Sequence, residues 1–287
     1  MGQKLVMKDD IMFKAFFSRY QNYLKSFLEA ILGDEIKIKT VTHDARLEQL
    51  TKEMKYGILD LDIELETGEI INVEMQLDDY KNIEERTIFY ASKKIVEQLE
   101  PKGNYKNLKK VIVIAILDYT LTDLPDYITE TVRVASRHRD YELNNSVKYY
   151  YIELEKFRKQ NPDMDEKLNQ WLAFIDMERG DLLEMAKKNN KEIKNAIEGY
   201  EVLTGDAEVK RLAEIRLMSE LEEKAALASA IDKGTLIGME KGEKIGMEKG
   251  KKNEKIEIAK KMLSSKMSNE QIMDLTGLSI QEIEELT

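Results

Sequence analysis

The chain has 287 residues, 42% hydrophobic and 35% charged, a composition typical of a folded protein and not of a disordered one. It contains no cysteine and only two histidines, the distant His43 and His138, which excludes disulfides and cysteine-ligated zinc and argues against Ser-His-Asp catalysis, so that any metal would be a hard cation held by carboxylates. With a net charge of −10, any contact with nucleic acid would need a local basic patch, and the lack of an apolar run of roughly 18–20 residues predicts a soluble cytoplasmic protein without membrane contact.

The residue types divide the chain into two parts. Up to about residue 157, aromatic and β-branched runs alternate with turn signals, whereas Lys, Glu, Leu, Ala and Met dominate beyond Pro162. We predict an α/β (α+β) domain over 1–160, a helical region over 161–256, and a small helical, helix-turn-helix-like module over 257–287.

The first elements are predicted to be two helices and a strand. The phenylalanines within 13–17 have the spacing of a short amphipathic helix, a second helical pattern covers 23–31, and Gly33 is suited to end it. Apolar and basic residues alternate over 36–39, which indicates a strand.

The most regular stretch of the chain predicts a β-hairpin. Apolar and acidic residues alternate over 59–65, and apolar and polar residues alternate again over 71–78, on either side of Thr67-Gly68. Such a hairpin has one buried and one polar face.

The register of this hairpin decides which carboxylates meet. If Gly68 is the left-handed last residue of a three-residue loop, Asp60 stands opposite Glu74, whereas a shift of one residue sets Asp62 there. Two facing carboxylates repel unless a divalent cation lies between them, so the pair is a candidate metal site. Gln76 shares this face and could orient a water or a phosphate oxygen, although any hairpin with a solvated face shows the same alternation.

A helix over 82–99 and two more strands complete the predicted sheet. Ile88, Ile95 and Leu99 are assigned to the buried side of the helix. The apolar run 111–117 is typical of a central strand covered on both faces, and 147–154 indicates another strand. A helix between the hairpin and the central strand indicates a crossover, and therefore a mixed sheet.

The same helix carries basic and aromatic residues, Arg86, Tyr90, Lys93 and Lys94, and Lys55 precedes the hairpin. Positive charge beside a carboxylate pair is what metal-assisted phosphodiester cleavage requires, because the phosphate must be bound and its charge neutralised. An ordinary surface helix with charge pairs would show the same residues.

Beyond Pro162 the chain is predicted to be helical, beginning with an N-cap and first-turn proline at 161–162 and continuing through the apolar residues of 171–175. Glycines recur every four residues from Gly234 to Gly250. They would form either a stripe that lets two helices approach closely or a flexible linker.

The last residues are predicted to form a small helical hairpin, with a capping box that begins at Ser268 and a turn at Gly277. Residues 268–287 contain five acidic residues and no Lys or Arg. We therefore favour packing or homo-oligomerisation through the C-terminal helices over reading of the DNA major groove.

These residues, in this order, resemble a known nuclease family. The segments 10–14, 59–60, 73–76, 86–90 and 151–154 are similar to the recombination-promoting nuclease and transposase family of the PD-(D/E)XK superfamily. The resemblance implies a restriction-endonuclease-like core with a mixed sheet, followed by an α-helical C-terminal region. It also implies cleavage of DNA with Mg²⁺ or Mn²⁺.

Carried over residue by residue, Asp60 matches the family's first acid and Glu74 the acid of its E-X-K position, which implies that both bind metal. Gln76 stands where the wider superfamily usually has lysine, which leaves open how the attacking water is activated. Asp10 also matches a family position, and with Asp62, the alternative from the hairpin register, it is an accessory candidate.

We therefore expect a Mg²⁺-dependent DNA endonuclease with Asp60, Glu74 and Gln76 as its catalytic group. The residues assigned to DNA contact are Lys55, Arg86 and Tyr90. The alternatives are a nucleic-acid-binding protein that keeps the fold without turnover, and an oligomeric interaction protein whose hairpin carboxylates are merely solvated.

Overall fold

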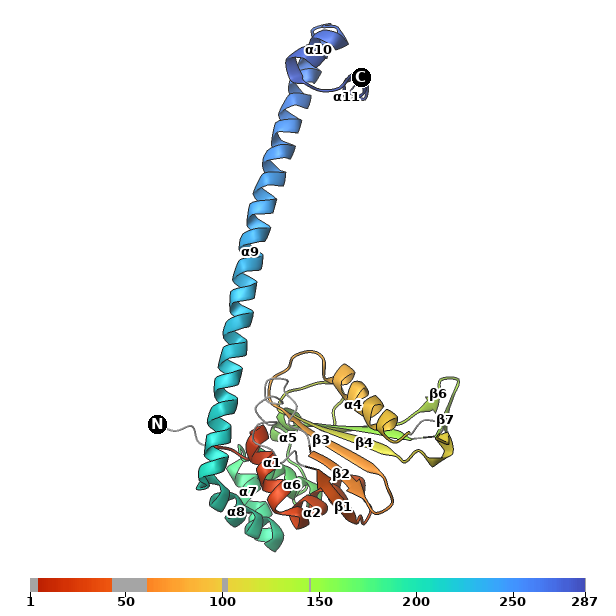
Figure 1. The fold of residues 1–287 in the computed structure, drawn as a ribbon, viewed down its shortest axis with the longest axis vertical. Coiled ribbons are helices and arrows are strands. Elements are labelled where there is room, and N and C mark those ends of the chain that lie inside the picture. The colour runs from red at the N-terminus through yellow and green to blue at the C-terminus, as the bar shows by residue number, and fades with distance from the viewer. Residues whose placement is uncertain (1–4, 43–60, 100–102, 145, 287) are drawn as a thin grey trace. The chain divides into compact units, whose positions relative to one another are not determined.

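The computed structural model describes residues 5–42, 61–99, 103–144 and 146–286. In chain order its elements are α1 (Asp10–Arg19), α2 (Gln21–Leu32), β1 (Ile38–Thr42), β2 (Leu61–Leu65), β3 (Ile70–Gln76), α4 (Ile83–Glu97), η1 (Tyr105–Asn107), β4 (Val111–Leu117), β5 (Ile128–Thr131), β6 (Val134–Ala135), β7 (His138–Glu142), β8 (Val147–Glu153), α5 (Leu154–Lys159), α6 (Lys167–Asp176), α7 (Gly180–Asn189), α8 (Lys191–Thr204), α9 (Ala207–Ser264), α10 (Asn269–Thr276) and α11 (Ile280–Glu284) (Figure 1).

The central sheet has six strands in the order β1-β2-β3-β4-β8-β5. β3, β4 and β8 are parallel, while β1, β2 and β5 pair antiparallel with their neighbours. The helix α4 forms the crossover between β3 and β4. The mixed sheet expected from the sequence is therefore confirmed, as is the helical C-terminal region.

The β2–β3 hairpin has the loop and register predicted first. The amide of Gly68 donates to the carbonyl of Leu65 at 2.9 Å, and Gly68 has φ of +83°, the left-handed conformation. Among the described pairs, Leu61 lies opposite Val73 and Asp62 opposite Asn72. The alternative register, with Asp62 opposite Glu74, is wrong because the glycine occupies the last position of the loop.

The two faces of the sheet are covered by different helices. Ile112, Ile114 and Ile116 of β4 belong to the main core, which also contains buried residues of α1, α2, α5 and α6 to α8. The alternate residues of β4 face α4, where Val111 and Val113 pack with Ala91. Figure 1 shows α4 alone above one face and the other helices of this unit below the sheet.

Aromatic side chains dominate the main core. Phe16 is fully buried, and its ring centroid lies 5.2 Å from those of Phe17 and Phe174. Trp171 is also fully buried, and its indole N–H donates to Ser26 at 3.1 Å. Residues of α1 and α6, far apart in the sequence, thus form one packed unit.

The buried side of α4 agrees with the prediction only at Ile95, which packs against the cluster of Ala91, Val111 and Val113. Leu99 lies beyond the end of the helix at Glu97. Ile88 is 55% exposed, and the residues that face the sheet are Ile83, Thr87 and Ala91. Apolar spacing misplaced this face because polar residues of α4 also point toward the sheet.

The helix expected at 161–162 begins later, at Lys167. Residues 161–166 instead form a turn in which the backbone carbonyl of Asp163 accepts from the side chain of Asn169. The N-cap is Glu166.

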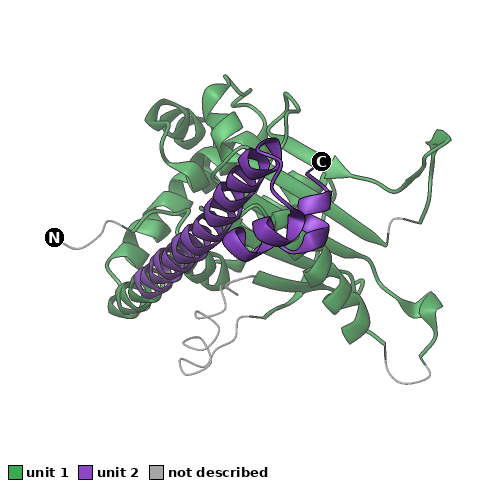
Figure 2. Ribbon diagram, turned by 90° about the horizontal axis from the view of Figure 1, so that it is seen from above, with its two compact units in different colours: residues 1–219 green, residues 220–287 purple. Residues whose placement is uncertain are grey.

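The described residues form two compact units, 1–219 and 220–287 (Figure 2). The sequence placed a limit near residue 160, whereas α6 to α8 belong to the first unit because their apolar residues share its core. The five glycines from Gly234 to Gly250 lie within the helix α9 and not in a linker.

The C-terminal unit ends in two short capped helices. Ser268 with Gln271, and Ser279 with Glu282, form capping boxes, and Gly277 ends α10 with φ of +66°. Ile272, Leu278 and Ile283 are among the residues of a small apolar core. Within the described residues, no helix combines the length and the apolar character that a membrane crossing requires.

We expect Phe16→Ala to lower the free energy of unfolding of the first unit by about 3–5 kcal/mol, because it leaves a cavity among packed rings. Phe89, on the outer side of α4, is 64% exposed, so Phe89→Ala should cost less than about 0.5 kcal/mol. Fluorescence of the single tryptophan, Trp171, during urea unfolding measures both. Equal losses would contradict the assignment of the core.

Candidate active site

Three polar side chains of β3 are buried beneath α4. Asn72, Glu74 and Gln76 alternate along the strand and are 1%, 3% and 5% exposed. Arg86 of α4 donates hydrogen bonds to Glu74 and Gln76, which shows that both face this helix. Burying a carboxylate costs free energy unless a cation or hydrogen-bond donors pair with it. The buried polar row therefore depends on the partners that α4 supplies.

Arg86 connects the members of this row. Its Nη2 donates to Oε1 of Glu74 and lies 3.3 Å from the hydroxyl of Tyr90, and its Nη1 donates to Oε1 of Gln76 at 3.0 Å. Gln76 in turn donates through Nε2 to the backbone carbonyl of Asp78 at 2.8 Å. Both ends of the Gln76 amide are therefore engaged in hydrogen bonds within the protein.

Lys94 extends the row along β2. Its ammonium donates to Asp62 at 2.6 Å, and Asn72 donates to the same carboxylate at 3.0 Å. Arg86, Tyr90 and Lys94 are four residues apart and lie on one side of α4. Part of the basic and aromatic set expected to meet DNA thus faces the sheet and neutralises its acids.

The polar row lies at the carboxyl end of the parallel strands. Gln76 pairs with Leu117 of β4, and Tyr119 follows two residues later with its hydroxyl buried and without a hydrogen-bond partner among the described residues. Burial raises the pKa of Tyr119, and the negative charges of Asp79 and Glu74 raise it further. Tyr119 therefore stays protonated at neutral pH.

The sequence analysis did not single out Tyr119. It follows the apolar run 111–117, and the carboxyl ends of such strands are where open α/β sheets bind ligands. Its position directly after this strand was therefore the signal by which the sequence could have identified Tyr119. The neighbouring Thr87 and Tyr151, whose hydroxyls lie 2.9 Å apart, were also missed, because no spacing in the sequence relates them.

The remaining predicted residues lie elsewhere. Asp10 accepts from Nε of Arg216 at 2.9 Å and from the amide of Ile11 at 2.7 Å. Asp60 and Lys55 fall outside the described residues, so their assigned roles stay predictions.

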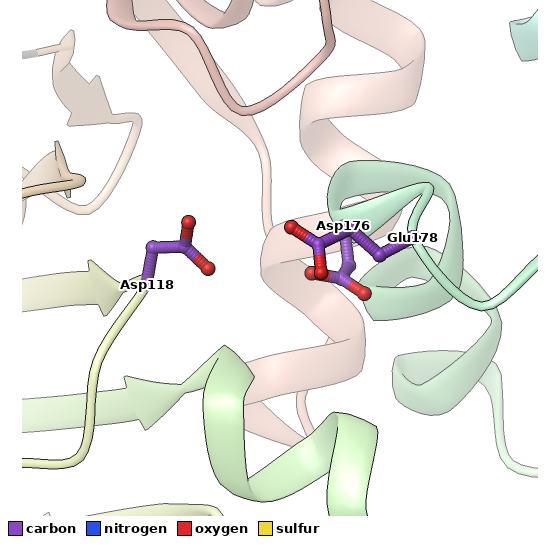
Figure 3. Close-up of side chains that lie close together, drawn as sticks. All are labelled: Asp118, Asp176 and Glu178. Carbon is purple, nitrogen blue, oxygen red and sulfur yellow. The ribbon is translucent and has the colours of Figure 1, made fainter.

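A second acidic group lies on the opposite side of the sheet. Asp118, Asp176 and Glu178 each offer an oxygen within 4.8 Å of the others (Figure 3). Lys8 donates to Asp118 at 2.7 Å and also to Glu178. Arg158 donates to Asp118 at 2.5 Å and to Asp176 at 2.6 Å.

Two fixed cations thus already pair with these three carboxylates. Burial raises the pKa of Asp176, and the hydrogen bond from Arg158 opposes that rise. A metal ion would have to displace Lys8 and Arg158, so we interpret this cluster as an ion network that ties the N-terminal segment, the end of β4, α5 and α6 together.

Glu74 is the better candidate for a metal ligand. Its buried carboxylate supplies the oxygen donor that Mg²⁺ and Mn²⁺ prefer. It lies at the carboxyl end of β3 with Arg86 as a positive neighbour. The donor chemistry of Glu74 therefore fits a hard divalent cation. Glu74 would supply one carboxylate ligand, and the ion would need further oxygen ligands from other groups.

Comparison with known families gives two matches. The model described as PD-(D/E)XK nuclease family transposase matches residues 7–230, more than half of the chain. The model described as Rpn/YhgA-like nuclease family, C-terminal HTH domain, matches residues 252–287. No curated protein and no solved structure matches the chain. The mixed sheet with its α4 crossover is therefore a PD-(D/E)XK nuclease core, and the C-terminal match supports a helix-turn-helix.

We expect Arg158→Met to lower the free energy of unfolding by about 3–5 kcal/mol, because it leaves Asp176 buried without its hydrogen-bonded cation. Lys159→Met on the same helix is the matched control. Its partner Glu155 is solvent-accessible, so the loss should stay below about 1 kcal/mol. Urea unfolding followed by tryptophan fluorescence measures both, and a similar loss in the two variants would contradict a structural role for this network.

Proposed function

The chain belongs to the PD-(D/E)XK nuclease family transposases, and from this premise we propose that it is a metal-dependent endonuclease that cleaves DNA. The observation that carries the proposal is the buried Glu74, which Arg86 binds at the carboxyl end of β3. A protein with only a structural use for this position would be expected to fill it with an apolar residue, because a buried ion pair is rarely the more stable choice.

Asp60 is the second proposed metal ligand. The last described pair of the hairpin is Leu61 with Val73, and the next residue of β3 is Glu74. Extending this antiparallel register by one residue would set Asp60 opposite Glu74. The register of the described residues supports this choice over Asp62, which lies opposite Asn72 and not opposite Glu74.

When bound, Mg²⁺ or Mn²⁺ supplies charge neutralisation at the phosphate and a water of lowered pKa. Asp60 and Glu74 would hold the ion, and Arg86 keeps Glu74 in place. Because Arg86 also contacts Gln76 and Tyr90, its orientation is fixed by three neighbours. It is thereby suited to present positive charge to a DNA phosphate.

The protein's proton chemistry is limited at this site. Gln76 has no basic group, and the raised pKa of Tyr119 leaves that side chain as a neutral hydrogen-bonding group. The described residues near Glu74 thus offer positioning and charge stabilisation more than base catalysis. For this reason, a DNA-binding protein that keeps the fold without turnover is the second candidate function.

DNA contacts are proposed for Lys55, Arg86 and Tyr90, and a cytoplasmic location is proposed for the protein. A homo-oligomer formed through the C-terminal helices is proposed as well. It is supported by the glycines of α9, where an added methyl group would meet no atom within 4 Å. It is also supported by exposed apolar residues of the same helix, such as Leu227 and Ile231.

We expect purified protein to nick plasmid DNA with Mg²⁺ or Mn²⁺ and not with EDTA. Glu74→Gln and Asp60→Asn should each reduce the rate by more than about 100-fold, because each removes a proposed metal ligand. Glu64→Gln is the matched control, since Glu64 lies on β2 and pairs with Lys39 at the surface.

Two results would change the assignment. If Asp62→Asn abolishes cutting and Asp60→Asn does not, the second ligand is Asp62. If wild-type protein binds DNA but cuts it with neither metal, the non-catalytic candidate replaces the nuclease.

We expect a molar mass above that of a single chain at micromolar concentration in light scattering. Ile231→Lys together with Leu227→Lys should shift the mass toward the monomer, because both introduce charge on an exposed apolar part of α9. The matched control is Leu124→Lys, at an exposed position of the first unit. A monomeric wild type would contradict the proposed assembly.

A further inference from the structure

A small β-ribbon, formed by β6 and β7, is not part of the proposed active site. β6 and β7 form a separate two-stranded sheet that extends beyond the end of β5 (Figure 1, right). All five residues of β7 are exposed. An isolated two-stranded ribbon is only marginally stable in water. We therefore consider binding of a partner as a reason for this ribbon.

The centre of β7 is irregular and fully exposed. Val134 pairs with Glu142, whereas the next residue of β6, Ala135, pairs with His138. The residues between these partners, which include Arg139 and Tyr141, therefore bulge out of the ladder, and all are exposed. Arg137 lies in the turn that joins β6 to β7.

These arginines are available for a partner. Within the described part of the chain, neither Arg137 nor Arg139 forms an ion pair, unlike Arg86 and Arg158, which are held by buried acids. Tyr141 is 64% exposed. Two available guanidinium groups beside an exposed aromatic ring match the phosphates and sugars of a nucleic acid.

We propose that the exposed end of the β6–β7 ribbon, with Arg137, Arg139 and Tyr141, binds duplex DNA at a position separate from the scissile phosphate. This inference rests on the proposed function. A two-stranded ribbon fits the major groove, which is about 12 Å wide. Arginine and tyrosine side chains would contact the backbone that borders the groove.

The sheet register sets the scale of the separation. Glu74 pairs with Ala115, Ala115 with Tyr151, and Tyr151 with Thr129, three strands away. Three strand spacings and the eight residues from Thr129 to Arg137 give a distance of at most roughly 40 Å. One turn of B-DNA is about 34 Å, so a single duplex could reach both positions.

The test is the affinity for a duplex of about 30 base pairs, roughly three turns, measured by fluorescence anisotropy in EDTA at several salt concentrations. Arg137→Ala with Arg139→Ala should weaken binding at least about tenfold and reduce the salt slope by about 2. Replacing both arginines with lysine should retain most of the affinity, because the positive charges remain. Asp140→Asn is the control: it removes a negative charge from the same ribbon and should not weaken binding.

Single-turnover cleavage at saturating DNA should be unchanged in the alanine double variant, because saturation removes the effect of weaker binding on the rate. Its thermal midpoint should also be unchanged, since both arginines are exposed. Wild-type affinity and salt slope in that variant would overturn the ribbon contact and leave the nuclease proposal standing. A wild type that neither binds nor cuts DNA would overturn both.

Discussion

The buried ion pair between Glu74 and Arg86 is the interaction on which the arrangement of the nuclease core depends. A carboxylate that is 3% exposed cannot remain charged beneath a helix without a cation beside it. Arg86 supplies that cation from α4, and Gln76 and Tyr90 fix the guanidinium. The position of α4 over β3 is therefore set by charge as well as by the apolar contacts of Ala91 and Ile83.

The opposite face of the sheet is organised differently. Aromatic rings from α1, α2 and α6 fill its core, and the ion network around Arg158 closes its edge at the end of β4. The strands are thus supported by aromatic packing on one side, while the other side holds a row of buried polar groups beneath α4. This division agrees with the family match, which covers both faces.

Much of this could be predicted from the sequence, and the exceptions have physical causes. Strict alternation and the left-handed Gly68 defined the hairpin and its register, because only one loop places a glycine where φ is positive. The inward side of α4 was missed because a helix that covers buried acids does not follow apolar spacing. Tyr119 and the ribbon were missed because their positions depend on which strands become neighbours.

The glycines of α9 have a consequence for local unfolding. Each glycine costs a helix roughly 0.5–1 kcal/mol relative to alanine, and no described side chain packs against the five from Gly234 to Gly250. Backbone amides in this segment should therefore exchange with solvent through brief local openings, while amides of β4, buried on both faces, exchange only when the whole core opens. One continuous helix thus joins a stretch of fast exchange to a domain of slow exchange.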